Sequence, residues 1–192
     1  MNVFLAGERV LLRPLEMDDL EAFVGWFADR EATRYSMGVW LFPWSRYETE
    51  QWLKRTLLDK ETLSLGVVEK ERGSLVGYAG IASISLMNRS GEYYIFLGAK
   101  ESWGRGYGTE VTRLIVDYGF ASLNLHRIML TVSEPNTAGV RAYTKAGFQQ
   151  EGILRDACYR DGAYHNKLVM AILRSVWEAD RASQASGEAK AQ

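Results

Sequence analysis

Three glycines stand at alternate positions of the stretch ESWGRGYGT, residues 101–109, directly after the apolar run EYYIFLGAK. The apolar run predicts a buried strand, and the amphipathic stretch TEVTRLIVDYGF after the glycines predicts a helix. Glycine loses the most backbone freedom on folding, so its use here indicates that the turn needs positive φ angles or unobstructed backbone. The chain therefore places a strand, a tight glycine turn and a helix in immediate succession.

A helix that follows a strand so closely points its unpaired N–H groups and the positive end of its dipole out of the turn. Glycines there let an anionic ligand reach the backbone, so Gly104, Gly106 and Gly108 are compatible with a site for phosphate or pyrophosphate. They are equally compatible with a tight connection that binds no ligand. The glycines alone do not decide between these two interpretations.

Two familiar phosphate-binding motifs do not fit. The dinucleotide fingerprint G-x-G-x-x-G has Gly or Ala at its sixth position, where this chain has Thr109. That fingerprint also belongs to an initial βαβ unit, whereas several predicted strands precede this turn. The triphosphate-binding motif G-x-x-x-x-G-K-[ST] does not occur in the sequence. An NAD-binding oxidoreductase is therefore disfavoured, and a bound phosphate would belong to another class of ligand.

The remaining patterns predict the order β-α-α-β-β-β-α-β-α-β-β, which describes a single α+β domain around a mixed sheet over residues 1–180. The predicted strands are 8–15, 62–70, 74–86, 91–100, 126–134, 148–162 and 163–173, and the predicted helices are 16–27, 48–60, 109–120 and 136–147. Gly147 is a plausible cap for the last of these helices. The tail 181–192, RASQASGEAKAQ, is small and polar, and we expect it to be disordered.

Composition narrows the class of partner. The formal net charge of the 192 residues is −1, so there is no basic excess for a nucleic-acid backbone. A single cysteine, Cys158, excludes an internal disulfide framework and fits a reducing compartment. The first residues carry charges too early for a signal peptide, and no window approaches the ~18 apolar residues of a membrane span. We expect a cytoplasmic protein without nucleic-acid or membrane partners.

A second group of polar residues lies in SEPNTAGVRAYTKAGF, residues 133–148. Asn136 suits the start of a helix, because its side chain can accept a hydrogen bond from an unpaired backbone N–H. Tyr143 shares a helix face with it, and a phenol with an ordinary pKa near ~10 can donate a proton to a leaving thiolate or alkoxide. A tyrosine that merely packs in the core is the simpler interpretation of this residue taken alone.

Together these residues carry a resemblance. A strand ending in G-R-G-Y-G-T-E, an amphipathic helix and then N-x-x-x-x-x-A-Y-x-K-x-G-F resemble the GCN5-related N-acetyltransferase (GNAT) superfamily. The opening RVLLRPLEMDDL and the closing EGILRDACYRDGAYHNKLVMAIL are similar to its branch of ribosomal-protein alanine and spermidine acetyltransferases. The resemblance covers about residues 8–174 and implies an α+β fold with a mixed, mostly antiparallel sheet flanked by helices. In that fold a splayed strand pair holds the cofactor.

Two positions depart from the family pattern. Trp103 stands where the family's motif often has Gln or Arg, and Gly139 stands where many ribosomal-protein enzymes have Ser. The second difference removes one candidate acid.

The resemblance implies acetyl-CoA as co-substrate and no metal. The pyrophosphate is expected on the backbone amides of residues 105–109, and the pantetheine arm is expected to pair with the strand residues before them. The Leu97 N–H would polarise the thioester carbonyl, and Asn136 would hold the pantetheine or a water. The residues implied to contact acetyl-CoA are Leu97, Ala99, Arg105, Gly106, Tyr107, Gly108, Thr109 and Asn136.

Transfer to an amine requires a base for the ammonium and an acid for the departing thiolate. The resemblance implies Tyr143 as the acid and Glu92, thirteen residues before Arg105, as the base, directly or through water. A solvated glutamate at a strand end is an equally good interpretation of Glu92. Glu134 is a weaker candidate for the same role.

Other residues are less decisive. Five aromatic residues fall in the segment that lines the acceptor pocket of relatives, where they could hold a cationic amine or simply pack under a loop. They are Tyr35, Trp40, Phe42, Trp44 and Tyr47. His126 and His165 have no metal-ligand spacing, and Cys158 is expected to be a small buried residue.

Two functional hypotheses remain. The first is an acetyl-CoA-dependent N-acetyltransferase that acts by direct transfer on a primary amine, such as a protein N-terminus, a polyamine or another small amine. The second is a non-catalytic acetyl-CoA-binding module of the same fold. The enzyme is favoured because both Asn136 and Tyr143 are present. A homodimer is compatible with this branch of the family.

Overall fold

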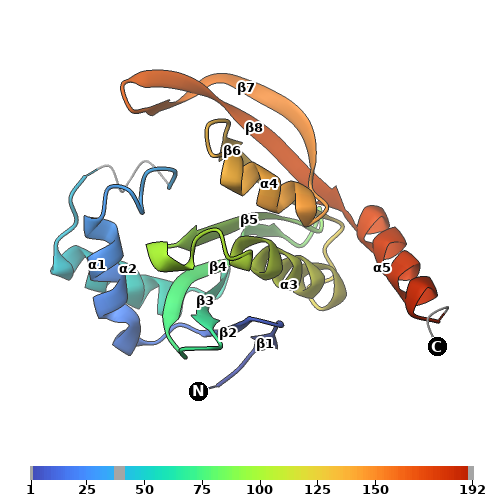
Figure 1. Ribbon diagram of the computed structural model, residues 1–192, viewed down its shortest axis with the longest axis horizontal. Helices are drawn as coiled ribbons and strands as arrows, with labels where there is room; N and C mark the ends of the chain where they lie inside the picture. Colours follow the sequence, from blue (N-terminus) through green and yellow to red (C-terminus); the bar gives the residue numbers. More distant parts are fainter. Residues whose placement is uncertain (1, 37–41, 190–192) are drawn as a thin grey trace.

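The computed structural model describes residues 2–36 and 42–189, and its central feature is an eight-stranded sheet (Figure 1). The strands lie in the order β1-β2-β3-β4-β5-β6-β8-β7 across the sheet. Their bounds are β1 Leu5–Ala6, β2 Val10–Pro14, β3 Leu63–Glu69, β4 Leu75–Ser85, β5 Ser90–Leu97, β6 Arg127–Ser133, β7 Gln149–Arg160 and β8 Ala163–Leu173. Every neighbouring pair is antiparallel except β5 and β6, which are parallel.

Five α-helices accompany the sheet in the described residues: α1 Leu20–Ala28, α2 Arg46–Leu58, α3 Tyr107–Ala121, α4 Thr137–Lys145 and α5 Arg174–Ala189. Short 3-10 turns, Met17–Asp19 and Lys100–Ser102, precede α1 and α3. α3 connects the two parallel strands, as a crossover between parallel strands requires. None of the described helices has the length and apolar character needed to cross a membrane.

The parallel pair β5–β6 is short. Its register joins only Ser90–Arg127, Gly91–Ile128 and Glu92–Met129, although both strands continue for several residues beyond. The two strands therefore part after Glu92. This gap, together with the mixed and mostly antiparallel sheet, confirms the fold class expected from the sequence.

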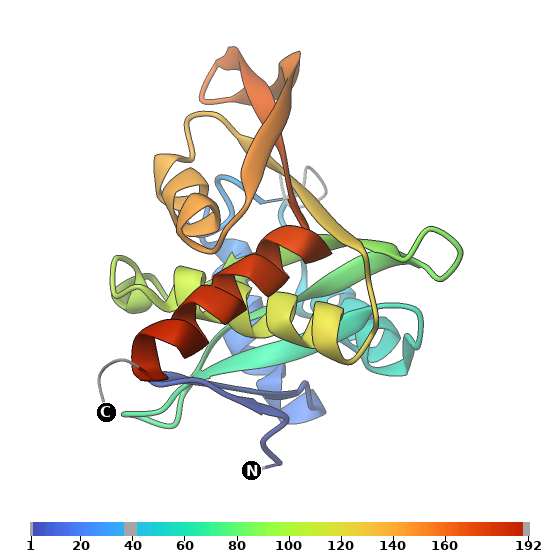
Figure 2. The same cartoon turned by 90° about the vertical axis from the view of Figure 1, so that its right-hand side faces the viewer.

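The two faces of the sheet are covered by different helices. On one face, α3 buries Val111, Ile115 and Phe120 against strand residues such as Ile81, Tyr93 and Ile128. Figure 2 shows α5 lying across α3 on this side, where the ring of Trp177 contacts Phe120 at 5.4 Å. These contacts follow from the i, i+3, i+4 spacing of the α3 apolar residues.

The other face carries an aromatic cluster under α1 and α2. Phe23 of α1 is fully buried and meets Trp52 of α2 at 4.9 Å and Tyr78 of β4 at 5.5 Å, both edge to face. Phe96 of β5 belongs to the same cluster. Successive residues of β5 thus alternate between the α3 face and the α1–α2 face, as the strand period requires.

Two parts of the secondary structure differ from the prediction. The strand Leu5–Ala6 was not predicted, since two residues carry no periodic signal. The helix α5, Arg174–Ala189, was not predicted either, and it includes residues 181–189 of the tail that was expected to be disordered. Its alanines favour helix, and the amphipathic start of α5 is anchored by Trp177, so the polar residues beyond extend a helix that is already nucleated. The other predicted helices and strands are confirmed with small shifts at their ends.

Candidate functional site

The glycine turn begins α3 without a side-chain cap. Gly106 is the N-cap at φ +83°, and Gly104 has φ +73°, so both adopt the left-handed conformation that the sequence suggested. α2 and α4 differ, because Ser45 and Asn136 accept hydrogen bonds from their first-turn N–H groups. The first N–H groups of α3 therefore remain available at a positive helix end.

The side chains of this turn are directed back onto the sheet. Glu69 of β3 is 1% exposed, and its Oε1 accepts hydrogen bonds from Arg105 Nη1 at 2.6 Å and from the Tyr107 hydroxyl at 2.9 Å. Burial and the bond to Glu69 raise the pKa of Tyr107. The Arg105 and Tyr107 side chains thus point away from the direction in which a ligand would meet their amides.

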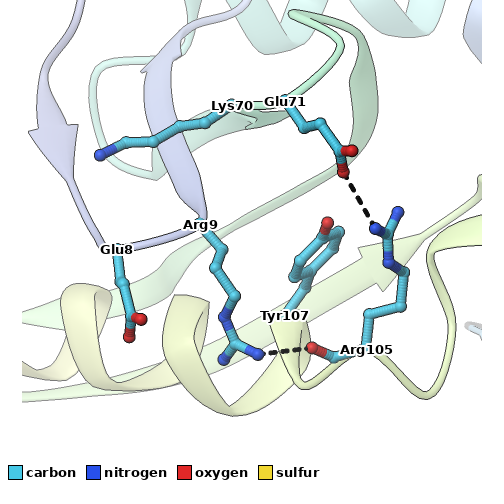
Figure 3. Close-up of a pocket in the computed structure, with 6 residues that line it drawn as sticks. All are labelled: Glu8, Arg9, Lys70, Glu71, Arg105 and Tyr107. Atoms are coloured by element: carbon cyan, nitrogen blue, oxygen red, sulfur yellow. Dashed lines mark hydrogen bonds and ion pairs between the residues drawn. The ribbon is translucent and has the colours of Figure 1, made fainter.

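Arg9 of the β1–β2 turn holds the same helix start from a second side. Its Nη1 donates to the Arg105 carbonyl at 2.7 Å and its Nε donates to Glu110 at 2.9 Å. The close-up in Figure 3 shows the Arg9 bond to Arg105 and the Arg105 bond to Glu71, around a pocket lined by charges of both signs. This pocket lies against the β2 and β3 side of the turn, where the guanidinium groups are already paired.

The gap between β5 and β6 begins after Glu92 and extends along β5 to Leu97, which lies beside this turn. The Arg89 carbonyl points toward β6, where it accepts a hydrogen bond from the Arg127 N–H at 3.2 Å. Alternate residues of a strand direct their polar backbone groups to the same edge. The groups that face the gap therefore belong to Tyr93, Ile95 and Leu97. The Leu97 carbonyl accepts a hydrogen bond from the Trp103 indole N–H at 2.8 Å.

Ala99 differs from the expectation. Its N–H donates to the Val76 carbonyl at 3.2 Å, and its carbonyl accepts from Ser102 Oγ at 2.6 Å. Both polar backbone groups of Ala99 thus have partners in the protein, because the chain turns away after Leu97 into the 3-10 turn. The edge that can pair with a ligand extends from Leu97 back to Tyr93, whereas the sequence suggested Leu97 and Ala99.

The glycines of the turn have different surroundings. A Cβ added at Gly106 would lie 3.0 Å from the Arg9 guanidinium, whereas one added at Gly108 would lie 3.8 Å from Ala142 of α4 and 4.0 Å from Leu97 of β5. Gly106 is therefore required by its positive φ and by Arg9. Gly108 instead keeps open the space between α4 and the β5 edge.

Asn136 caps α4, as predicted. Its Oδ1 accepts from the Gly139 N–H at 3.0 Å. A Cβ at Gly139 would lie 2.7 Å from Asn136 Nδ2, so the absence of a side chain at position 139 makes room for the Asn136 amide. The capping bond occupies the Asn136 oxygen and leaves its NH₂ group as the free donor end.

Tyr143 lies on α4 and is half-buried against the α3 face of the sheet. Its ring contacts Tyr93 edge to face at 6.0 Å, and burial raises the pKa of Tyr143 to about 12. Within residues 2–36 and 42–189 its hydroxyl makes no hydrogen bond, and it is not enclosed. This phenol stays protonated at neutral pH and can donate to a ligand.

Glu92 and Tyr143 belong to opposite faces of the sheet. Glu92 is the last β5 residue paired with β6, and by strand alternation it shares the α1–α2 face with Tyr94 and Phe96. Glu134 is exposed, and its carboxylate accepts from Asn166 Nδ2 at 3.0 Å. The structure thus brings Tyr143 and Glu92 to the two sides of the point where the strands part, and places Glu134 at the far end of β6.

The five aromatic residues of the segment that lines the acceptor pocket in relatives have different surroundings. Trp44 packs on Phe27 at 5.5 Å, and the Tyr35 hydroxyl donates to the Pro135 carbonyl at 3.3 Å. Phe42 and Tyr47 are exposed, and Trp40 lies outside the described residues. These contacts favour packing for Trp44 and bring Tyr35 to the loop that precedes Asn136.

The isolated histidines and the cysteine have ordinary surroundings. His126 is exposed and His165 is half-buried, and the described ranges hold no group of three His, Cys, Asp or Glu side chains suited to a metal. Cys158 is buried as predicted, with its sulfur 2.9 Å from Ser133 Oγ.

Sequence reasoning missed the residues that support the site from behind. Glu69, Arg9 and Glu110 hold the helix start, and Tyr93 and Thr112 connect β5 to α3 through a buried hydrogen bond of 2.9 Å. A glutamate at the end of the apolar run TLSLGVVEK was the one visible signal for Glu69. The other partners are far apart in the chain, and no local pattern pairs them.

Comparison with known proteins agrees with this geometry. A family model described as an acetyltransferase (GNAT) domain matches residues 9–149. An uncharacterised N-acetyltransferase of Bacillus licheniformis is 31% identical over 79% of this chain and 85% of its own length. Spermidine N(1)-acetyltransferase of Escherichia coli is 30% identical, and the match covers 91% of this chain and 91% of that protein.

A crystal structure agrees as well. Spermidine N-acetyltransferase from Vibrio cholerae, solved in complex with CoA and spermine, superposes with a TM-score of 0.78 at 29% identity, over 89% of this chain and 99% of that one. The parted strands and uncapped helix start therefore occur here in a fold shared with a CoA-binding enzyme. The chain belongs to the GNAT family of acetyltransferases.

Proposed function

We propose that this protein moves the acetyl group of acetyl-CoA directly to a primary amine of a polyamine-like small molecule, at the gap between β5 and β6. The observation that carries the proposal is that α3 begins, uncapped and glycine-lined, beside the Leu97 end of β5, where β5 and β6 are no longer paired. Acetyl-CoA contains a pyrophosphate, which suits the unpaired amides at the start of α3. It also contains an extended amide-bearing arm, which suits the unpaired edge of β5.

The geometry supports particular residues as those that would hold acetyl-CoA. The amides at the start of α3, from Gly106 to Thr109, suit the pyrophosphate because they are unpaired donors at a positive helix end. The edge from Tyr93 to Leu97 suits the amide-bearing arm, because its backbone groups have lost the β6 partner. Gly108 leaves the path between these two surfaces open. When bound, acetyl-CoA supplies the activated acetyl group.

Tyr143 serves as the acid. Its pKa of about 12 keeps the phenol protonated, and its hydroxyl is free to hydrogen-bond a leaving sulfur. Complete proton transfer from so weak an acid to a thiolate, whose conjugate acid has a pKa near ~8.5, is unfavourable. We therefore assign it hydrogen bonding to the developing negative charge, with the proton moving as the carbon–sulfur bond breaks.

Glu92 serves as the base on the opposite face. A planar thioester held in the gap would present one face to the α1–α2 side, where an amine could approach with Glu92 nearby. The carboxylate removes a proton from the ammonium, directly or through water, and so generates the nucleophile. Because the acid and the base lie on opposite sides of the sheet, they do not exchange a proton directly with each other.

The acceptor class rests on the relatives. The Escherichia coli and Vibrio cholerae proteins that cover most of this chain act on spermidine, and their names support a polyamine-like acceptor over a protein N-terminus.

Thiol release from acetyl-CoA tests this function. The amine panel should include spermidine, spermine, monoamines of matched length and a short peptide with a free N-terminus. We expect turnover with the polyamines and at least about tenfold lower kcat/KM with the peptide. Turnover with the peptide alone would overturn the acceptor class. Tight CoA binding without turnover of any amine would favour a non-catalytic module.

A further inference from the structure

Tyr93 is the first β5 residue beyond the last pair with β6. It lies between Tyr143, the proposed acid, and α3, whose first amides are proposed to bind the pyrophosphate. Its ring meets Tyr143 edge to face at 6.0 Å with an interplanar angle of 80°. Its hydroxyl lies 2.9 Å from Thr112 Oγ1 of α3. One side chain thus contacts both the candidate acid and the helix that begins at the glycine turn.

The direction of this hydrogen bond can be assigned. Thr112 Oγ1 lies 2.6 Å from the Gly108 carbonyl, which can only accept, so the threonine hydrogen is used there. Tyr93 must then donate its own hydrogen to Thr112. The result is an ordered series from Tyr93 through Thr112 to the first turn of α3.

Burial makes this series costly to rearrange. Tyr93 is 3% exposed and Thr112 is fully buried, so neither hydroxyl can exchange its partner for bulk water. Burial also raises the pKa of Tyr93 well above its usual value, which keeps its hydrogen in place at all working pH values. The ring is therefore held in one orientation under Tyr143.

We propose that Tyr93 is a positioning residue, which uses its hydrogen bond to Thr112 to fix the Tyr143 phenol relative to the start of α3. This inference rests on the proposed function, because Tyr143 and the α3 amides are assigned there. Tyr93 acts through Tyr143 and moves no proton itself. Its own hydrogen is committed to Thr112, so it has none to give to a ligand.

Removal of the hydroxyl should therefore affect turnover more than binding. In Tyr93→Phe the ring keeps its volume but loses its anchor, and small displacements of a reacting group can cost up to ~100-fold in rate. We expect kcat to fall about five- to tenfold, with the acetyl-CoA KM and the CoA Kd changed by less than about twofold. Thr112→Val should give the same result. Thr112→Ser keeps the hydroxyl, so its kcat should stay near that of the wild type.

Thr56→Val is the control matched to Thr112→Val. Thr56 lies on α2, and its Oγ1 donates to the Trp52 carbonyl at 3.0 Å, as Thr112 Oγ1 does to the Gly108 carbonyl on α3. The variant loses a comparable hydrogen bond away from Tyr93, so its kcat should stay near that of the wild type. The double variant Tyr93→Phe/Thr112→Val should lose no more activity than either single variant.

The outcomes separate the two proposals. Wild-type protein that transfers acetyl groups while Tyr93→Phe keeps full kcat would overturn the role of Tyr93 alone. An equal loss in Thr56→Val, or a low kcat in Thr112→Ser, would also overturn it, since a general loss of packing would then suffice. Wild-type protein that transfers to no amine would overturn the proposed function instead.

Discussion

The ring of Tyr143 on α4 stands edge-on to the ring of Tyr93 on β5, with centroids 6.0 Å apart. The contact lies directly beside the point where β5 loses its β6 partner, because Tyr93 follows the last paired residue. It places the one half-buried phenol of α4 next to the backbone edge that suits acetyl-CoA.

Tyr143→Phe should lower kcat at least about tenfold and leave the CoA Kd within about twofold, because the ring contacts remain and only the donor is lost. Steady-state kinetics and calorimetric titration with CoA measure the two quantities. Tyr118→Phe, a half-buried tyrosine of α3 whose ring packs on Phe4 at 5.0 Å, is the control. Equal kcat in both variants would remove Tyr143 from the mechanism.

The raised pKa of Tyr143 predicts a change of stability at high pH. Its pKa is about 12 in the folded protein and near ~10 in an unfolded chain, so the unfolded state loses the proton first as pH rises. Its contribution is complete below about pH 10 and declines between about pH 10 and 12, by roughly 2–3 kcal/mol in all.

Urea unfolding from pH 8 to pH 11.5 measures this effect as the difference between wild type and Tyr143→Phe. The difference isolates Tyr143 from the other buried tyrosines, which stay in both proteins. Parallel curves across the whole range would contradict the assignment of a raised pKa.

Gly108 and Gly106 should respond differently to added side chains. Gly108→Val places methyl groups between Ala142 and Leu97, where the cofactor path is proposed, so the CoA Kd should rise about tenfold or more while the midpoint of unfolding changes little. Gly106→Val forces a β-branched residue to φ +83° and against Arg9, so it should cost at least about 2 kcal/mol of stability as well as affinity.

Gly25→Ala adds a methyl group in α1 with no atom within 4 Å and serves as the control for both glycine variants. An unchanged CoA Kd in Gly108→Val would place the cofactor elsewhere.

Arg105→Ala should destabilise the fold through Glu69. The carboxylate is 1% exposed, and its Oε2 has no partner among the described residues, so the loss of Arg105 leaves a nearly uncompensated buried charge. We expect a loss of roughly 2–3 kcal/mol in urea unfolding.

Two further variants identify the cause. Arg105→Ala combined with Glu69→Gln should recover at least half of the loss, because the charge is removed while Gln can still accept from Tyr107. Arg34→Ala breaks the exposed pair with Asp161 and should cost less than about 1 kcal/mol. A large loss in the double variant would mean that the Arg105 side chain matters for packing alone.

Much of the fold could be predicted because it depends on local patterns. The i, i+3, i+4 spacing in TEVTRLIVDYGF placed α3, and Asn136 was predicted as the cap that the structure confirms. The positive φ angles at Gly104 and Gly106 follow from glycine's freedom in a tight turn. Ala99 could not be predicted, since its partner Val76 belongs to a strand more than twenty residues away.

The amino-acid sequence by itself determined most of the helices and strands, the glycine turn and the family, because helix periodicity, strand apolarity and backbone freedom are properties of neighbouring residues. Only the tertiary structure decided which backbone edge is free, that Glu92 and Tyr143 lie on opposite faces, and that Glu69 binds Arg105 and Tyr93 binds Thr112. Those relations arise from strand register and from contacts between residues distant in the chain. Such pairings are selected by the packing of the whole core, and no short stretch of sequence encodes them.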